Sequence, residues 1–272
     1  MRKIILTVFI TAILSIAACA GFYAWYIAPS AGNATQIINQ ISHGDLTVLT
    51  QFNAIGDLEG YVVQSTQNNS QNIIYMDKQQ HYIISGTVLA ADGTNISAQN
   101  YQTYIAPQSA SLAFNYLSNI SYIQQGSANA PHQAYIIFDP NCIYCHRLFD
   151  SLQPFIQKGS LAVRWIPVAF LKSSSSGRAY AILSSKNPLA MLIQNETNFN
   201  ENTEDGGAPP LNSPSSAVAQ QLKNNMAFLT ETQISATPAI LYKSKEGIAN
   251  LISGMVSPDK LGPMIEGFGT CF

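Results

Sequence analysis

The sequence is short of charge and of cysteine, and each shortage excludes a class of protein. Charged residues make up 10% of the 272 residues, well below the ~25% that is usual for soluble domains. The formal net charge is -2, so no basic surplus is available for phosphate backbones and nucleic acid is not an expected partner. The length allows two modest domains, each with a real core, once a targeting segment is subtracted.

With only four cysteines, the chain is not a small scaffold held together by many disulfides. Cys19 lies in an apolar N-terminal stretch, and Cys271 stands next to the last residue. Cys142 and Cys145 are close partners in a C-x-x-C arrangement. In an oxidising compartment such a pair is either a structural bridge or a redox couple, and its local context must decide. Cys271 is expected to be a free thiol, with intermolecular pairing as the alternative.

Residues 1–29 are expected to form a signal or anchor segment. Two basic residues precede an apolar stretch over residues 4–28 that contains no ionisable acid or base, as in export signals. About 20 apolar residues span a bilayer, and aromatic residues gather at the far end of this stretch, so we expect it to remain as a membrane anchor. Cleavage after Ala20 and lipid attachment at Cys19 are open alternatives. In each case the bulk of the chain is expected across the membrane.

In the N-terminal half, alternating apolar and polar residues predict a small antiparallel sheet after a short helix over 35–41. Turns rich in Gly, Asn and Asp separate the expected strands, which cover 46–49, 58–63, 72–76 and 82–88. Apolar residues at helical spacing then predict a helical connector over 107–125.

The C-terminal half opens with a continuous apolar run over 134–138, which is typical of a strand buried on both faces. A turn at 139–141 follows, and Cys142 stands where a helix begins. The later segments are predicted as a strand at 161–168, a helical region at 178–192, a surface loop or mobile excursion at 195–216, a helix at 218–229, strands at 239–242 and 248–252, and a helix from 258. This order predicts a thioredoxin fold with an inserted helical subdomain.

Cys142-Ile143-Tyr144-Cys145 has the composition of a redox site. A thiolate is the reactive form of cysteine, so such a site needs a thiol of lowered pKa and a second thiol within disulfide reach. A cysteine at a helix N-terminus meets unpaired backbone N–H groups and the positive end of the helix dipole, which stabilise a thiolate. We therefore predict that Cys142 is the nucleophile and that Cys145, one turn further in, resolves the mixed disulfide.

A second element is Thr237-Pro238, directly before an apolar strand and far along the chain from the cysteines. In a thioredoxin fold this position holds a cis-proline facing the active site, and the preceding backbone can pair with an extended substrate strand. We predict that Thr237 and Pro238 lie on the substrate side. Taken alone, a Thr-Pro pair before a strand indicates no more than a turn.

The cysteine motif has three other interpretations, as a haem attachment signal, a structural bridge or part of a zinc site. Cys142-Ile143-Tyr144-Cys145-His146 is also the C-x-x-C-H signal for c-type haem attachment, but here it follows a buried strand and a Pro-Asn turn, which favours the redox interpretation. A purely structural bridge would close a very short loop and stabilise little. No second pair of ligands completes a zinc site, so no metal or other cofactor is expected.

Taken together, these segments resemble the DsbG and DsbC group of periplasmic disulfide isomerases, and DsbG most closely. The resemblance covers roughly residues 35–265. It rests on motifs that occur in order along the chain: Leu58-Glu59-Gly60-Tyr61, His81-Tyr82-Ile83-Ile84-Ser85-Gly86, Phe138-Asp139-Pro140-Asn141-Cys142-Ile143-Tyr144-Cys145, Ala181-Ile182-Leu183-Ser184-Ser185-Lys186-Asn187-Pro188 and Thr237-Pro238-Ala239-Ile240.

The resemblance implies an α+β protein in which an N-terminal cystatin-like dimerisation domain is joined by a helical linker to a C-terminal thioredoxin-like domain with a helical insertion. On this basis the expected domains are 30–106, 107–130 and 131–272. It further implies a V-shaped periplasmic homodimer that isomerises wrong disulfides, or reduces oxidised cysteines including sulfenic acids, in exported proteins. A membrane electron donor of the DsbD type is implied as a partner. Tyr144 matches the aromatic residue of the family motif and is expected to contact substrate.

Two departures from the family pattern carry consequences. Ile143 stands where DsbG-like proteins have Pro and DsbC-like proteins have Gly, and this position tunes the redox potential. The expected anchor also differs from the freely soluble family pattern and suggests a dimer tethered to the inner membrane. A second class of function is a holdase-like chaperone, in which binding of unfolded clients dominates and redox chemistry is secondary.

Overall fold

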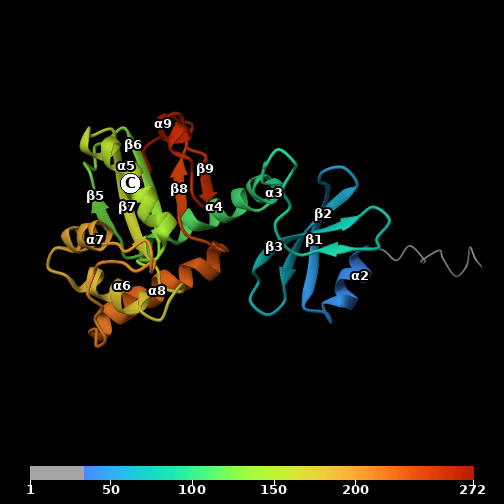
Figure 1. Cartoon of the computed structure of the whole chain (residues 1–272), viewed down its shortest axis with the longest axis horizontal. Coiled ribbons are helices and arrows are strands. Elements are labelled where there is room, and N and C mark those ends of the chain that lie inside the picture. The colour runs from blue at the N-terminus through green and yellow to red at the C-terminus, as the bar shows by residue number, and fades with distance from the viewer. Residues whose placement is uncertain (1–33) are drawn as a thin grey trace, which may run out of the picture. The chain divides into compact units, whose positions relative to one another are not determined.

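A computed structural model describes residues 34–272 of the chain (Figure 1). The expected signal or anchor segment, with Cys19 and Ala20, lies outside these residues. The described chain divides into two compact units, one made of residues 34–67 and 74–86 and the other of residues 68–73 and 87–272. Among the described residues, no helix is both long and apolar enough to cross a membrane.

The first unit is a helix packed on a sheet. Within residues 34–272 the sheet has four strands in the order β1-β2-β3-β4, which span Leu46–Asn53, Leu58–Ser65, Gln71–Asp77 and Ile83–Ile84. Helix α2 (Ala34–Ile41) buries Ala34 and Ile38 against Tyr61, Val63 and other apolar side chains of the strands. The close approach of two strands explains one glycine, because a Cβ on Gly60 would lie 2.2 Å from the ring of Phe52 on β1.

The last strand of this sheet is much shorter than the predicted 82–88. β4 pairs only through Ile83 and Ile84. Beyond it the backbone leaves the sheet. The carbonyl of Val88 accepts from Ile96 N, and the backbone N–H of Val88 donates to Ser97 Oγ. Val88, which the alternating pattern placed in a strand, is therefore bonded to the start of the next helix.

The predicted connector over 107–125 is wrong at both ends. Helix α3 (Ile96–Tyr104) begins earlier, capped by Asn95, and α4 (Ala106–Tyr116) follows after a single residue. A short 3₁₀ turn, η1 (Leu117–Asn119), then leads into a strand, β5 (Ile123–Gln125), where helix had been expected. β5 pairs with the neighbouring strand through Trp165, and this tertiary pairing overrides the local helical spacing.

The second unit is built on a mixed sheet of five strands within the described part of the chain, in the order β5-β7-β6-β8-β9. The central strand β6 (His132–Phe138) runs parallel to β7 (Leu161–Pro167) and antiparallel to β8 (Ala239–Lys243), which pairs with β9 (Ala249–Ser253). Besides α4, the helices around it are α5 (Ile143–Gln157), α6 (Ser175–Ser184), α7 (Pro188–Thr197), α8 (Ser216–Thr232) and α9 (Pro258–Glu266).

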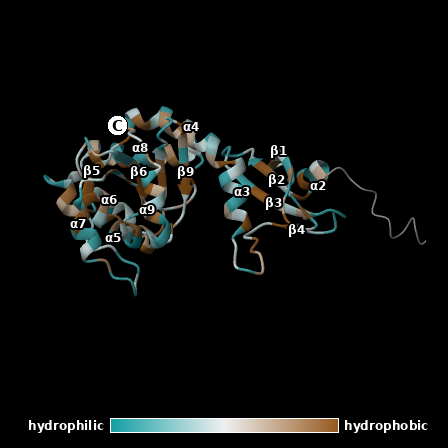
Figure 2. Ribbon diagram, turned by 90° about the horizontal axis from the view of Figure 1, so that it is seen from above, coloured by the Kyte–Doolittle hydropathy of each residue, from teal (hydrophilic) through white to brown (hydrophobic). Residues whose placement is uncertain are grey.

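Both faces of this sheet are covered, as the apolar run over 134–138 predicted. Successive side chains of a strand point to opposite faces. Ile136 and Phe138 accordingly pack with α5 and α9, whereas Tyr135 and Ile137 pack with α4 and α8. In Figure 2 hydrophobic residues are seen in the strands, and the helices carry both hydrophobic and hydrophilic residues. β6 is therefore buried on both faces, and the two cysteines follow its carboxyl end.

The helical region predicted at 178–192 consists of two helices. α6 ends at Ser184, and Asn187 caps α7 by accepting a hydrogen bond from Ala190 N, 3.1 Å. Pro188 is the first residue of α7. Proline is well suited to that position because it has no N–H to leave unpaired, and it disfavours helical backbone in the residue before it. The Asn-Pro pair therefore ends one helix and starts another.

Gln133 ties the end of the described chain into the sheet. Its side chain, 1% exposed, accepts from the backbone N–H groups of Cys271 and Phe272 at 2.7 and 2.8 Å and donates to Ala128 O at 2.8 Å. Phe272 in turn packs its ring over the guanidinium of Arg164, 4.0 Å away. One buried amide therefore holds two chain segments against the strand that leads to the cysteines.

We expect Gln133→Leu to lower the free energy of unfolding by about 2 kcal/mol or more, because it leaves several backbone groups without partners. Urea denaturation followed by circular dichroism measures this loss. The control is Gln220→Leu on the exposed side of α8, which should change stability by only a few tenths of a kcal/mol. Equal stability of the two variants would contradict the assigned role of Gln133.

Candidate functional site

Cys142 and Cys145 lie at the start of α5, directly after the central strand. Cys142 is the N-cap residue with extended backbone, φ -86° and ψ 110°, and its Sγ accepts a hydrogen bond from Cys145 N at 3.2 Å. Cys145 lies one turn into the helix and is 1% exposed. Among the described residues, these two and Cys271 are free thiols. The helix start therefore places the first sulfur where backbone N–H groups can stabilise a negative charge.

The pKa values of the two thiols move in opposite directions. A hydrogen bond from the Cys145 thiol lowers the pKa of Cys142 below its usual value, and the backbone N–H groups of Tyr144 and Cys145 add to this against the effect of burial. Burial raises the pKa of Cys145, and the neighbouring Cys142 raises it further. Ionisation is thus favoured at Cys142 and disfavoured at Cys145.

Thr237 and Pro238 come to the same place from the far end of the chain. The peptide bond between them is cis. Cys142 Sγ donates to Thr237 O at 3.5 Å, across 95 residues of sequence. Tyr144, between the cysteines, is 52% exposed. The structure thus brings Thr237 to the sulfur of Cys142, and leaves the Tyr144 side chain open to solvent.

Asp139 organises the turn that leads to Cys142. Its side chain is 1% exposed. Asn141 N and Ser175 Oγ donate to Oδ1 at 2.9 and 2.7 Å, while Phe170 N and Leu171 N donate to Oδ2 at 2.8 and 3.0 Å. The carbonyl of the same residue accepts from Cys142 N at 2.9 Å. A buried carboxylate is tolerated when its lone pairs are satisfied in this way.

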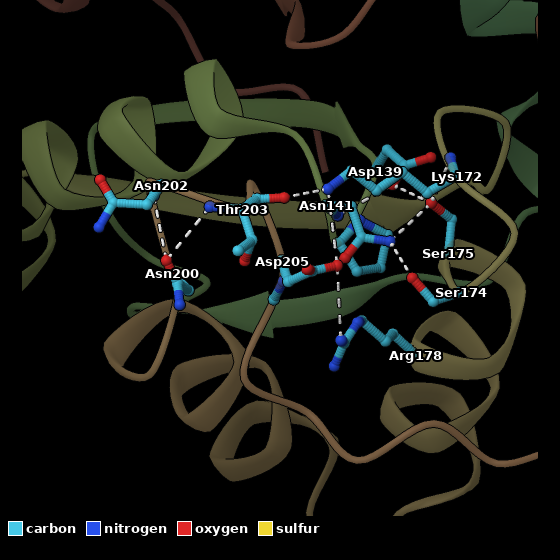
Figure 3. Close-up of polar contacts among 12 residues, drawn as sticks. Asp139, Asn141, Lys172, Ser174, Ser175, Arg178, Asn200, Asn202, Thr203 and Asp205 are labelled. Carbon is cyan, nitrogen blue, oxygen red and sulfur yellow. Dashed lines mark hydrogen bonds and ion pairs between the residues drawn. The ribbon is translucent and has the colours of Figure 1, made fainter.

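Asn141 extends this network to the inserted helices. Its amide donates to Ser174 Oγ and Ser175 Oγ at 3.0 and 2.9 Å, and its Oδ1 accepts from Gly206 N at 3.0 Å. Figure 3 shows Asp139 and Asn141 next to Ser174 and Ser175, with Asp205 and Arg178 beside them. The turn before Cys142 is therefore held from two directions.

A sequence profile of the thioredoxin-like domain family matches residues 121–268, more than half of the chain. This chain belongs to the thioredoxin-like family. The predicted thioredoxin fold is confirmed, and the match begins just before β5, the strand that had been expected as helix.

Two curated relatives of this thioredoxin-like protein are named thiol:disulfide interchange protein DsbG. The one from Pseudomonas aeruginosa is 26% identical over 228 residues, covering 84% of this chain and 87% of that protein. The one from Escherichia coli is 26% identical over 226 residues, covering 82% and 87%. Among solved structures, Proteus mirabilis ScsC in a transitional conformation matches with 20% identity and a TM-score of 0.47, covering 62% of this chain and 81% of that one. The expected resemblance to DsbG is confirmed.

His146, which the haem interpretation would use as a ligand, is enclosed by this thioredoxin-like domain. Its ring stacks on Phe199 with centroids 4.6 Å apart. Its Nδ1 lies 3.3 Å from the buried Glu196 carboxylate, and its Nε2 lies 3.7 and 3.9 Å from Asp150 and Glu201. An axial haem ligand must present a free ring nitrogen, whereas both nitrogens here face carboxylates.

The segment predicted as a surface loop or mobile excursion over 195–216 is partly buried. α7 continues to Thr197, and Asn195, Glu196 and Ala208 lie in the interior. Asn195 contacts the cysteine turn and Glu196 contacts His146. The Asn, Gly and Pro content that suggested a mobile loop provides tight turns and buried side-chain hydrogen bonds here. No periodicity in the sequence could have shown these contacts, because they join residues 50 or more positions apart.

We expect Asp139→Asn to lower the free energy of unfolding by about 2–4 kcal/mol, because an amide cannot accept from all of these donors and would turn its own N–H₂ toward some of them. Thermal unfolding of the reduced protein measures the loss. The exposed Asp259→Asn at the start of α9 is the control and should cost a few tenths of a kcal/mol. An equal loss of stability in the two variants would contradict the role of Asp139 in holding the turn.

We expect the pKa of His146 to lie above its usual value, because the Glu196 carboxylate stabilises the imidazolium and outweighs burial. Glu196→Gln should lower that pKa, as read from the imidazole proton shifts in an NMR titration. Asp150→Asn, which removes an exposed carboxylate at 3.7 Å, is the control and should lower it less. A larger effect from the Asp150 change would reverse the assignment.

Proposed function

We propose that this chain is a thiol-disulfide oxidoreductase that reduces or isomerises disulfides in exported proteins through Cys142 and Cys145. The observation that carries the proposal is the N-cap position of Cys142, whose sulfur accepts from Cys145 N and lies against Thr237 O. The names of the DsbG relatives describe thiol:disulfide interchange and support the same activity.

In the proposed reaction the Cys142 thiolate attacks one sulfur of a substrate disulfide. A mixed disulfide forms and the other substrate sulfur leaves as a thiolate. For isomerisation, a thiolate of the substrate then attacks the mixed disulfide and frees Cys142. For net reduction, Cys145 loses its proton and attacks Cys142 Sγ, so that the Cys142–Cys145 disulfide forms and the second substrate thiolate is released. Two electrons have then passed to the substrate.

A sulfenic acid would follow the same route. The Cys142 thiolate attacks the oxidised sulfur, and hydroxide leaves and is protonated to water. Cys145 resolves the mixed disulfide as before. Reduction of a disulfide or of a sulfenic acid leaves this chain with a Cys142–Cys145 disulfide, which an electron donor must reduce. A membrane protein of the DsbD type is proposed for that role.

Apolar side chains around the turn are suited to partly unfolded substrates. Tyr144, Phe170 and Leu171 are large apolar residues with exposed side chains. The backbones of Phe170 and Leu171 are held by Asp139, which also accepts from Cys142 N. We propose that these side chains contact exposed apolar segments of the substrate, while Thr237 and Pro238 present the backbone beside the sulfur.

We further propose that the first unit is the cystatin-like dimerisation domain of a periplasmic homodimer, and that residues 1–29 tether it to the inner membrane. A helix on an antiparallel sheet suits that role. The apolar side chains of Ile41, Leu49 and Ile55 are exposed on this unit and would be available to a second copy.

We expect Cys142→Ser to abolish refolding of a scrambled multi-disulfide protein, because a hydroxyl at neutral pH does not attack a disulfide. Cys145→Ser should still attack and should accumulate a mixed disulfide with the substrate, visible on a non-reducing gel. Rates of regained substrate activity measure both effects.

The control for this pair is Cys271→Ser. Burial raises the pKa of Cys271 to about 11, so almost none of it is thiolate at neutral pH and the exchange rate should not change. Refolding activity that survives Cys142→Ser would instead support the holdase alternative, in which binding is sufficient.

A further inference from the structure

Residues 195–208 link the end of α7 to the active-site turn. Asn195, fully buried, donates from Nδ2 to Pro140 O at 3.0 Å and to Glu196 Oε1 at 3.0 Å. Its Oδ1 accepts from Ala208 N at 3.1 Å, and its carbonyl accepts from Gly207 N at 2.8 Å. One side chain therefore joins the turn before Cys142 to both ends of the 195–208 segment.

Gly206 shows how closely this segment approaches the turn. A Cβ at this position would lie 2.2 Å from Asn195 Oδ1 and 2.3 Å from Pro140 O. No side chain fits there without displacing one of the two. The backbone N–H of Gly206 also donates to Asn141 Oδ1 at 3.0 Å, so the contact is a hydrogen bond as well as a close packing.

Ion pairs hold the outer part of the segment. Asp205 lies 3.6 Å from Lys172 Nζ and 3.8 Å from Arg178. Lys172 also donates to Thr203 O, and Arg178 donates to Ala208 O. Figure 3 shows Lys172, Arg178, Thr203 and Asp205 around Asn141. The segment is thus anchored to the loop and helix that follow β7, independently of the cysteine turn.

The ionisation of Cys142 is sensitive to this arrangement, because the hydrogen bonds that stabilise its thiolate depend on the direction in which the sulfur points. Cys142 Sγ accepts from Cys145 N only while the residue keeps its extended N-cap backbone. That backbone continues from Pro140 and Asn141, the two residues that the 195–208 segment holds. Hydrogen bonds weaken steeply when their angle falls, so a small rotation of the turn would remove stabilisation from the thiolate.

We propose that Asn195 is a positioning residue for thiol exchange: through the Pro140 carbonyl it keeps the sulfur of Cys142 aligned with the N–H groups at the start of α5. This inference rests on the proposed function, since it assigns a task to the inserted helical subdomain within that reaction. Asn195 does not touch the reacting atoms. Cys145 is the titratable group in contact with Cys142 and is unchanged by the variants below.

The test is the pH profile of Cys142 alkylation in the full-length reduced protein. Iodoacetamide is the probe, and mass spectrometry of the Cys142 peptide separates it from the other thiols. We expect Asn195→Ala to raise the apparent pKa of Cys142 by about half a unit or more, which makes alkylation at a pH below that pKa about threefold slower.

Asn225→Ala is the matched control. Asn225 is equally buried, donates to Ser121 O and Pro167 O, and accepts from Ser121 N. The Asn225→Ala variant should lose comparable stability, because it also leaves backbone groups without hydrogen-bond partners. The pKa of Cys142 should stay unchanged. A shift of the same size in both variants, or in neither, would overturn the proposal.

Gly206→Ala is the second variant and keeps every hydrogen-bonding group. It wedges a methyl group between Asn195 and Pro140, and it should raise the pKa of Cys142 in the same direction. An unchanged pKa in folded Gly206→Ala would also overturn the proposal. The alkylation profile is measured without any disulfide substrate, so a wild-type protein that fails in refolding would refute the proposed function alone.

Discussion

The buried carboxylate of Asp139 is the constraint on which the geometry of the site depends. A charge inside a protein costs several kcal/mol unless hydrogen bonds replace its water. Here the replacements come from Asn141, from Phe170 and Leu171 after β7, and from Ser175 on α6. Satisfying this one carboxylate therefore brings the loop after β7 and the start of α6 to the turn before Cys142. The turn is thus held by its own Asp139 and Asn141 together with partners from distant parts of the chain.

The two thiols acquire different chemistry from the same helix start. Cys142 is the cap and receives N–H groups, whereas Cys145 is inside the turn and loses its solvent. Because Cys145 also hydrogen bonds to Cys142, ionisation of the first thiol is favoured at the expense of the second. In the proposed reaction, the order of attack and resolution follows from the position of each sulfur along one helical turn.

The inserted helices contribute more than bulk to the domain. Asn195 and Gly206 contact the turn before the reactive cysteine, and Glu196 and Phe199 enclose His146 after the second one. The cysteine motif is consequently held on both sides by one insertion. This arrangement also explains why a segment rich in Asn, Gly and Pro is partly buried, since short polar residues can satisfy backbone groups inside a protein.

Much of this protein is determined by local sequence. The apolar run before Cys142 could be recognised as a buried strand, the C-x-x-C motif as the start of a helix, and Thr237-Pro238 as part of the same site, because each depends on periodicity or on backbone preferences within a few residues. Two features were not predicted. The strand at 123–125 forms because it pairs with Trp165, and the break before Pro188 forms because Asn187 caps the next helix. The burial of Asn195 and Glu196, the enclosure of His146 and the convergence on Asp139 were decided by the tertiary structure alone. These depend on contacts between distant residues, and only the packed fold, by removing water from the polar groups, makes those contacts necessary.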